Sequence, residues 1–202
     1  AIRYNQMAIA ASADPFYSQF PKLSLGMSYV SDGQYDKARE PLEDVLRNAQ
    51  SLGSEVLGTA SQAFLAAVLI AEGHFHRGIK ILEEAQRQFL KKNARWRYCF
   101  TELILGEIFL AIVLRKTPIN FSIMAKNFIF LVKNVPFASR KAKNHYNKAI
   151  EAAREISAKG VQGQAYLGLG NLYMNEGKND KAMESISNAI HLFELCGAET
   201  FL

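Results

Sequence analysis

Residues 166–189 read YLGLGNLYMNEGKNDKAMESISNA, and their pattern is the clearest indication of the fold. Leu169-Gly170 is followed by Tyr173, and small or apolar residues recur at three- and four-residue steps after Gly177. Such spacing is typical of helices that bury one face. Gly177 stands where the first helix has to stop, because glycine adopts a positive φ at little cost. The stretch therefore predicts two helices joined by a glycine turn.

The same pattern recurs along the chain with a period of 40 residues. The small residue that follows Leu in the first helix occurs at Gly26, Ala66, Gly106 and Gly170, in steps of 40, 40 and 64. A small residue of the second helix occurs at Ala38, Gly78, Ala142 and Ala182, in steps of 40, 64 and 40. Both series place one insertion of 24 residues in the third unit, between Gly106 and Ala142. Periods of this length indicate a repeat architecture, in which each unit buries its apolar face against the next.

The repeats predict an all-α fold, an α-α superhelix of about four helix-turn-helix units with the 24-residue insertion in the third. We expect a single array over 1–202. Its units are expected at about 19–58, 59–98, 99–162 and 163–202, with the insertion near 115–138. Residues 1–18 are expected to be the tail of a preceding unit, as if the chain began inside a longer array. Uncapped ends expose apolar surface, so a homodimer through the ends of the array is a further expectation.

These residues resemble the tetratricopeptide repeat, and the first and fourth units match its pattern best. The resemblance implies a domain that binds proteins or peptides in a groove lined by the first helices of the units. Asn171 stands where some domains of this family place an amide that binds peptide backbone or carboxylate. Met27, Ala67 and Glu107 stand at the matching positions. Recognition of a C-terminal carboxylate is therefore not expected, since Glu107 would repel it.

The second half, about residues 105–202, is similar to the helical-repeat tail of large bacterial signalling proteins. Two of the strings that carry this likeness are FLVKNVPFA at 130–138 and LFELCGAE at 192–199. In that family a class III adenylate or guanylate cyclase domain and an ATPase of the signal-transduction type precede the repeats. Neither the metal-binding carboxylates of the cyclase nor a phosphate loop stands in these residues. The resemblance therefore implies a regulatory or scaffolding module, and not an enzyme.

The composition is that of a globular chain that needs neither metal nor disulfide. Of the 202 residues, 49% are apolar and 21% are charged, which excludes disordered and collagen-like classes. Cys99 and Cys196 form no CxxC pair, so a reducing, cytoplasmic location is expected. No apolar stretch reaches the roughly 20 residues that span a bilayer. No catalytic residue, cofactor or metal site is predicted, since His74 and His76 have no third ligand nearby.

The middle of the sequence is strongly basic. Residues 85–150 contain thirteen Lys and Arg but only Glu102 and Glu107, a net charge of +11, so the remainder of this +5 chain carries −6. No acid stands between Ile108 and Ile150. Such a region attracts anionic partners, so binding of nucleic acid or of another anionic surface is the alternative function. Charge on ordinary solvated helix faces explains the same composition, and nucleic acid is less expected as a partner than protein.

The insertion is where a partner is expected to bind, because insertions emerge on one face of a repeat array. Its apolar residues recur at three- and four-residue steps at Phe121, Met124, Phe128, Leu131 and Val132. Lys126 and Lys133 fall between them, and Pro118 and Pro136 bound the segment. The predicted helix either packs on its own array or presents a partner-binding or membrane-surface face. The candidate partner-binding residues are Phe121, Met124, Lys126, Phe128, Lys133, Asn171 and Glu107.

Overall fold

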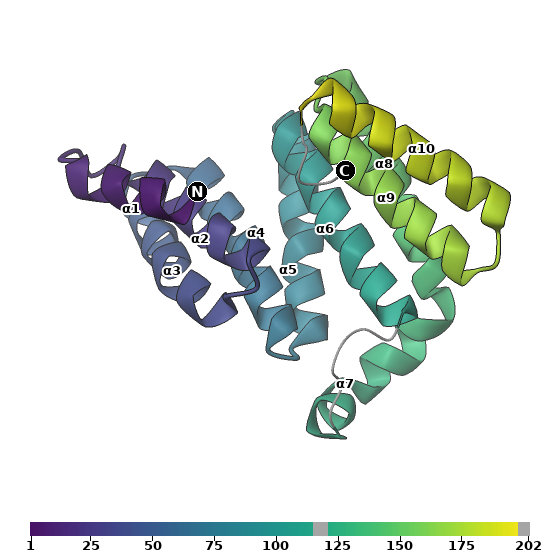
Figure 1. The fold of residues 1–202 in the computed structure, drawn as a ribbon. Coiled ribbons are helices and arrows are strands. Elements are labelled where there is room, and N and C mark those ends of the chain that lie inside the picture. Colours follow the sequence, from purple (N-terminus) through teal and green to yellow (C-terminus); the bar gives the residue numbers. More distant parts are fainter. Residues whose placement is uncertain (115–120, 198–202) are drawn as a thin grey trace. The chain divides into compact units, whose positions relative to one another are not determined.

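The computed structural model describes residues 1–114 and 121–197, and the side chains of all these except 121–125. Throughout this part of the chain the regular elements are helices (Figure 1). The chain divides into two compact units, Ala1–Gln88 and Phe89–Leu202, and each is described by itself. The structure thereby confirms the predicted all-α helical-repeat fold.

The first unit is a succession of helices joined by short turns. Its elements are α1 (Ile2–Ala11), α2 (Gln19–Ser31), α3 (Tyr35–Ser51), α4 (Glu55–Ala71) and most of α5 (Phe75–Lys91). Helix α1 packs on α2, α2 on α3, and α3 on α4. Ala38, Leu42 and Val45 of α3 are completely buried, so the apolar stripe predicted from their spacing forms the core of this unit.

The second unit contains the interrupted repeat. Its elements are α6 (Arg95–Val113), α7 (Phe121–Asn134), the 3₁₀ turn η1 (Val135–Phe137), α8 (Ala138–Glu155), α9 (Lys159–Asn175) and α10 (Asn179–Leu195). Helix α6 packs on α8, α8 on α9, and α9 on α10. Helix α7 and η1 therefore stand between the two halves of the third helix pair, as the predicted insertion requires.

The small residues of the first helices let the two helices of a pair approach closely. A Cβ atom added to Gly26 would lie 2.5 Å from the side chain of Leu42, and one added to Gly170 would lie 2.6 Å from that of Ile186. Both distances are shorter than any ordinary carbon contact. The glycines are therefore packing residues, as the repeat pattern predicts.

The first helices end on glycines in the left-handed conformation, at Gly33 (φ 73°) and Gly177 (φ 70°). The N–H of Lys178 donates to the carbonyl of Tyr173 at 2.9 Å and closes the last turn of α9. This confirms the predicted glycine turns. It also directs each second helix back along the first.

The second helices end on a left-handed residue as well, in a column that the sequence conceals. Its members are Gly53, Asn93, Ser157 and Gly197, with φ between 53° and 64° and in steps of 40, 64 and 40 residues. Only two of the four are glycines, so sequence inspection does not find the column. A residue with a side chain costs about 1–2 kcal/mol in this conformation.

Replacing Ser157 with glycine should stabilise the second unit by about 0.5 kcal/mol. Relief of the left-handed conformation exceeds the added backbone entropy of glycine, which costs about 0.5–1 kcal/mol. Thermal unfolding followed by circular dichroism should show a small rise in Tm. The control, Gly177→Ala at φ 70°, should lower it. A lower Tm for Ser157→Gly would show that the left-handed conformation of Ser157 does not reduce the stability of the second unit.

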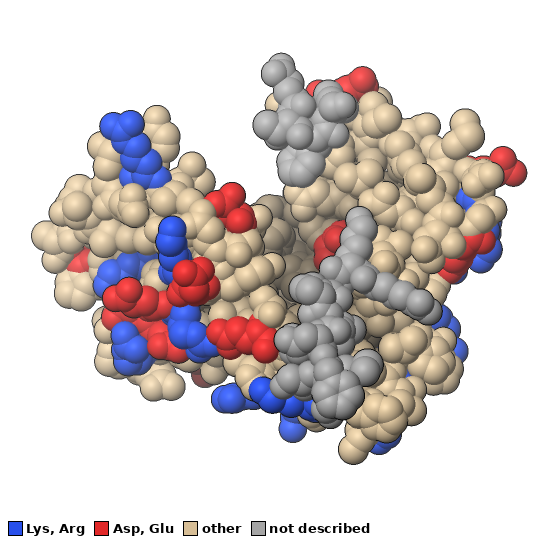
Figure 2. All heavy atoms as spheres, turned by 60° about the horizontal axis from the view of Figure 1, so that its bottom comes forward, with Lys and Arg blue, Asp and Glu red and all other residues tan. Residues whose placement is uncertain are grey.

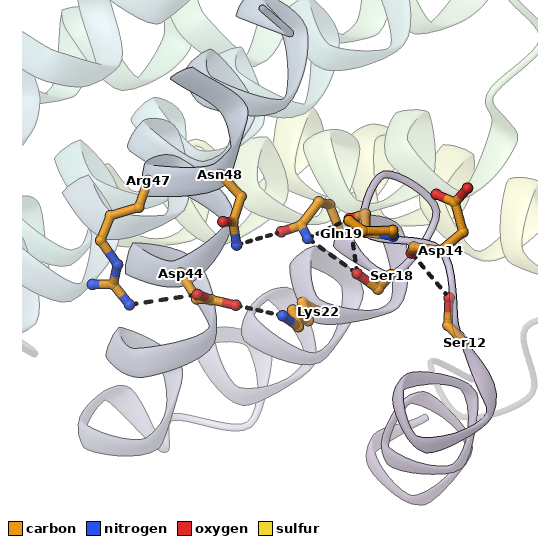
Figure 3. Close-up of polar contacts among 9 residues, drawn as sticks. Ser12, Asp14, Ser18, Gln19, Lys22, Asp44, Arg47 and Asn48 are labelled. Atoms are coloured by element: carbon orange, nitrogen blue, oxygen red, sulfur yellow. Dashed lines mark hydrogen bonds and ion pairs between the residues drawn. The ribbon is translucent and has the colours of Figure 1, made fainter. Parts of the chain in front are cut away.

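Polar contacts fix α2 against α3 in the first unit (Figure 3). Gln19 is 2% exposed and accepts a hydrogen bond from Asn48 at 3.3 Å. Lys22 donates to Asp44 at 2.5 Å, and this hydrogen bond lowers the pKa of the Asp44 carboxyl. These contacts set the start of α2 against the middle of α3.

Candidate functional site

The described side chains of helix α7, from Lys126 to Asn134, lie partly on a covered side and partly on an exposed side. Phe130 and Asn127 are buried, at 9% and 5% exposure. Phe128, Ile129 and Val132 are exposed to 62%, 70% and 57%. The side chains of Phe121 and Met124, which the sequence also placed on the partner-binding face, lie outside the described residues. The structure brings Phe128 and Val132 to the exposed face.

The exposed apolar surface continues from α7 into η1. Val135 and Phe137 are 51% and 47% exposed. Leu131, which the sequence placed in the same stripe as Phe128, is half-buried. This segment is apolar almost all round, so its pattern does not tell the covered face from the open one.

Cations border the exposed face. Lys126 and Lys133 of α7 are both exposed, and Arg140 of α8 stacks its guanidinium over the Phe137 ring at 5.0 Å. Lys141 is turned inward, since its ammonium donates to Asn134 at 2.7 Å. Figure 2 brings the α7 end of Figure 1 forward, and its lower right shows tan and blue surface without red. We call the set Lys126, Phe128, Ile129, Val132, Lys133, Val135 and Phe137 the α7 face.

The other two candidate residues lie on first helices of the second unit. Asn171 is exposed on α9 and makes no side-chain hydrogen bond within the described residues. Glu107 is exposed on α6, and its carboxylate accepts a hydrogen bond from the hydroxyl of Tyr146 at 2.9 Å. Glu107 thus helps to hold α8 on α6.

A groove of about 390 Å³ lies in the first unit, between α3, α4 and α5. It is lined by Arg39, Glu43, Leu46, Gln62, Leu65, Leu69, Arg77, Ile81 and Glu84. Arg39 is held at its edge by Glu43 at 3.2 Å and by both oxygens of Glu72 at 2.6 and 2.7 Å. Sequence reasoning missed this groove, because it depends on side chains from three helices.

A buried acid lies between α6 and α8, and sequence reasoning missed it too. Glu102 is completely buried, and its carboxylate lies 2.6 Å from the His145 ring nitrogen Nδ1. Tyr98 hydrogen-bonds to the same carboxylate, and the Lys148 ammonium lies 3.9 Å away. The His145 ring stacks on Phe109 with their centroids 5.5 Å apart. The cluster joins α6 and α8, and its members Glu102 and His145 are 43 residues apart in the sequence.

Several cations of the basic middle are neutralised by acids that lie outside it. Arg87 pairs with Glu84 at 2.5 Å, Arg95 with Glu155 at 3.2 Å, and Lys143 with Glu176 at 3.0 Å. The net charge of residues 85–150 therefore overstates the positive potential that a ligand would meet.

A carboxylate at the end of a first helix ties it to the preceding second helix in each unit. In the first unit this is the pair of Glu72 with Arg39. In the second unit Glu176 binds Lys143 at 3.0 Å and Lys178 at 2.7 Å. The spacing from Arg39 to Lys143 and from Glu72 to Glu176 is 104 residues, so both pairs occupy one column of the repeat.

Replacing Glu176 with glutamine should destabilise the second unit by about 1–3 kcal/mol at neutral pH. Burial opposes the charged form, but hydrogen bonds from Lys178, Ser139 and Lys143 outweigh it and lower the pKa of Glu176 from 4.5 to about 2. The charged group thus adds stability above its unfolded pKa. This contribution is lost as the pH falls from about 4.5 through about 2.

Urea unfolding of both proteins between pH 7 and pH 2 measures this effect. The difference between them should shrink below about pH 4.5 and become small near pH 2. The control is Glu184→Gln, an exposed acid of α10, whose effect should be small at every pH. A difference for Glu176→Gln that does not depend on pH would contradict the assignment.

The helix pairs, the packing glycines and the left-handed turns define a tetratricopeptide-like helical-repeat domain. The tetratricopeptide repeat family matches residues 163–193, which cover most of α9 and α10. Among curated proteins none matches the chain. Repeats of this family generally mediate protein–protein interaction, and their fold is typically non-catalytic.

Metal-binding and membrane-spanning features are not found in the described part of the chain. Within it, no group of three or more His, Cys, Asp or Glu side chains is placed to hold a metal ion. Among the described helices, none is both long enough and apolar enough to cross a membrane. Cys99 is buried, which raises the pKa of its thiol to about 11, whereas Cys196 is exposed.

Proposed function

We propose that this domain is a non-catalytic protein-binding module, and that its partner docks on the α7 face. The observation that carries the proposal is the exposure of five large apolar side chains, between 47% and 70%, on adjoining turns of α7 and η1. Contiguous apolar surface on a water-soluble domain is characteristic of interaction sites. The cations that border it give such an interface the polar rim that binding surfaces have.

We further propose that the domain is a cytoplasmic regulatory part of a larger bacterial signalling protein of the cyclase and ATPase type. Support comes from the likeness of residues 105–202 to the repeat tails of those proteins. Binding at the α7 face would act by population shift. It would favour one arrangement of the catalytic domains, provided that the partner binds the two arrangements with different affinity.

Affinity capture from a native lysate tests the binding role. The wild-type domain is compared with the double variant Phe128→Ser, Val132→Ser, at low and at high salt. A defined protein that is retained at high salt and lost in the variant is the expected result, because apolar contacts survive screening. The control is Met183→Ser, Ile190→Ser, which removes two exposed apolar side chains from α10. Equal retention by all three proteins would contradict a role for the α7 face.

The alternative function, binding of nucleic acid or of another anionic surface, is supported by the acid-free run from Ile108 to Ile150. It predicts nucleic acid that is retained only at low salt, since phosphate binding weakens steeply with salt. The roles of Asn171 and of a homodimer through the array ends stay predictions. Sedimentation of the control variant tests the homodimer, because Met183 and Ile190 lie on the last helix.

A further inference from the structure

We infer that the partner segment on the α7 face is an acidic, amphipathic α-helix. The inference rests on the proposed function and adds the chemical class of the partner. Phe128, Val132 and Val135 follow one another at steps of four and three residues, so they form a single stripe along the helix surface. From Phe128 to Val135 the stripe runs for about two turns, roughly 10 Å.

The shape of the stripe favours a helix as its occupant. A row of apolar side chains on an exposed helix forms a ridge, and a second helix with an apolar stripe packs its own ridges beside it. A partner that adds a β-strand needs the edge of a sheet, and the described residues contain no strand. Helix-on-helix packing is therefore the arrangement that removes most of this surface from water.

The charges favour an acidic partner. Lys126 and Lys133 are seven residues apart and lie on the same border of the stripe, next to Ile129. The opposite border is formed by the half-buried, uncharged Leu131. Lys126 and Lys133 make no ion pair within the described residues. Carboxylates spaced at seven residues on one border of a partner helix would face both ammonium groups at once.

The position of Lys126 and Lys133 on one border of the stripe disfavours a membrane surface or a nucleic acid as the partner. A helix lying in a membrane surface is served by cations on both borders of its apolar face, whereas the two lysines of α7, Lys126 and Lys133, lie on one border. A nucleic acid needs a track of several cations, whereas α7 presents two exposed lysines, Lys126 and Lys133, and the guanidinium of Arg140 lies over the Phe137 ring. The surface fits an apolar helix with an acidic border better than it fits either.

Peptide binding to the full chain tests the inference. The probe is a synthetic helix of about five turns with a leucine stripe and glutamates at seven-residue spacing on one border. Its control is the same peptide with lysine in place of each glutamate. Binding is followed by fluorescence anisotropy. The glutamate peptide should bind the wild-type domain at least about tenfold more tightly than the lysine peptide.

Reversing the charge of the two lysines on the α7 face is the most direct test of the inference. In the variant Lys126→Glu, Lys133→Glu the preference should reverse, so that the lysine peptide binds more tightly. The matched control, Lys159→Glu, Lys181→Glu, changes two exposed lysines of α9 and α10 in the same unit by the same charge and should keep the wild-type preference. The inference would be overturned if the α7 variant and the control variant changed the preference between the two peptides to the same extent.

The remaining outcomes separate this inference from the proposed function. Suppose that both peptides bind with equal affinity and that the double variant Phe128→Ser, Val132→Ser binds neither. This result would overturn the acidic class of the partner but leave the α7 face as a binding surface. Binding to vesicles of phosphatidylcholine and phosphatidylserine in equal parts, without binding to either peptide, would overturn both. Peptide binding that Phe128→Ser, Val132→Ser does not weaken would place the peptide elsewhere and overturn the inference.

Discussion

Replacing Tyr146 with alanine should destabilise the second unit by about 3–5 kcal/mol, the range found for large buried aromatic side chains. Tyr146 of α8 is completely buried, and its ring lies between two glycines on different helices. A Cβ atom on Gly106 of α6 would lie 2.7 Å from this ring, and one on Gly168 of α9 would lie 2.5 Å from its Cε1 and Oη atoms. One side chain therefore joins three helices.

The glycines give this prediction a test of its own. Alanine is the better helix former by about 1 kcal/mol, so an unconstrained Gly→Ala change inside a helix stabilises. Gly168→Ala should instead destabilise, since overpacking against a ring held on both sides costs about 1–3 kcal/mol. Gly160, on the same helix, has nothing within 4 Å of an added Cβ. Gly160→Ala should accordingly stabilise.

Urea unfolding measures the four proteins, with Tyr146→Phe as an additional variant. Loss of the hydroxyl breaks only the hydrogen bond to Glu107, so Tyr146→Phe should cost about 1 kcal/mol. The idea of a ring clamped by two glycines fails if Gly168→Ala and Gly160→Ala have the same sign.

Replacing His145 with leucine should be the second large effect, at about 3–5 kcal/mol. The ring nitrogen Nδ1 of His145 lies 2.6 Å from the carboxylate of Glu102, whose side chain is completely buried. Loss of the imidazole removes this close contact from the buried carboxylate, and the Lys148 ammonium lies 3.9 Å away. A buried charge whose main partner is removed retains its full desolvation penalty.

The double variant His145→Leu, Glu102→Leu distinguishes this cause from simple loss of packing. Replacing both members of a buried pair with apolar side chains of similar size is often close to neutral, because no charge is left behind. The double variant should therefore be more stable than His145→Leu alone in urea unfolding. If the two changes add, the cost of His145→Leu lies in its packing on Phe109 and not in the pair.

The composition of residues 85–150 and their folded arrangement lead to different estimates of the positive charge that a ligand would meet. Thirteen cations against two acids suggested one anionic-ligand surface over residues 85–150. Arg95 and Lys143 in fact pair with Glu155 and Glu176, which lie beyond that window. Composition sums charges along the chain, whereas a ligand meets the charges that folding leaves unpaired. This is why the α7 face, with two lysines that form no ion pair in the described part of the chain, carries more weight than the total charge.

The sequence by itself determined the repeat. Leu25-Gly26 and Leu169-Gly170 mark the close contact within a helix pair, and Gly33 and Gly177 mark its turn. These features are local, because each depends on one backbone conformation or one small residue and recurs in frame. The number of residues between successive repeats likewise predicts where α7 interrupts the third helix pair.

The polar contacts between the helices follow from tertiary packing and not from local sequence. The pairs of Glu102 with His145 and of Glu176 with Lys143 join residues 43 and 33 positions apart, and no local pattern marks them. The structure also decided which apolar face of α7 stays open, burying Phe130 and exposing Val132. Local periodicity shows that a face is apolar, but whether it is covered depends on neighbours that are distant in the sequence.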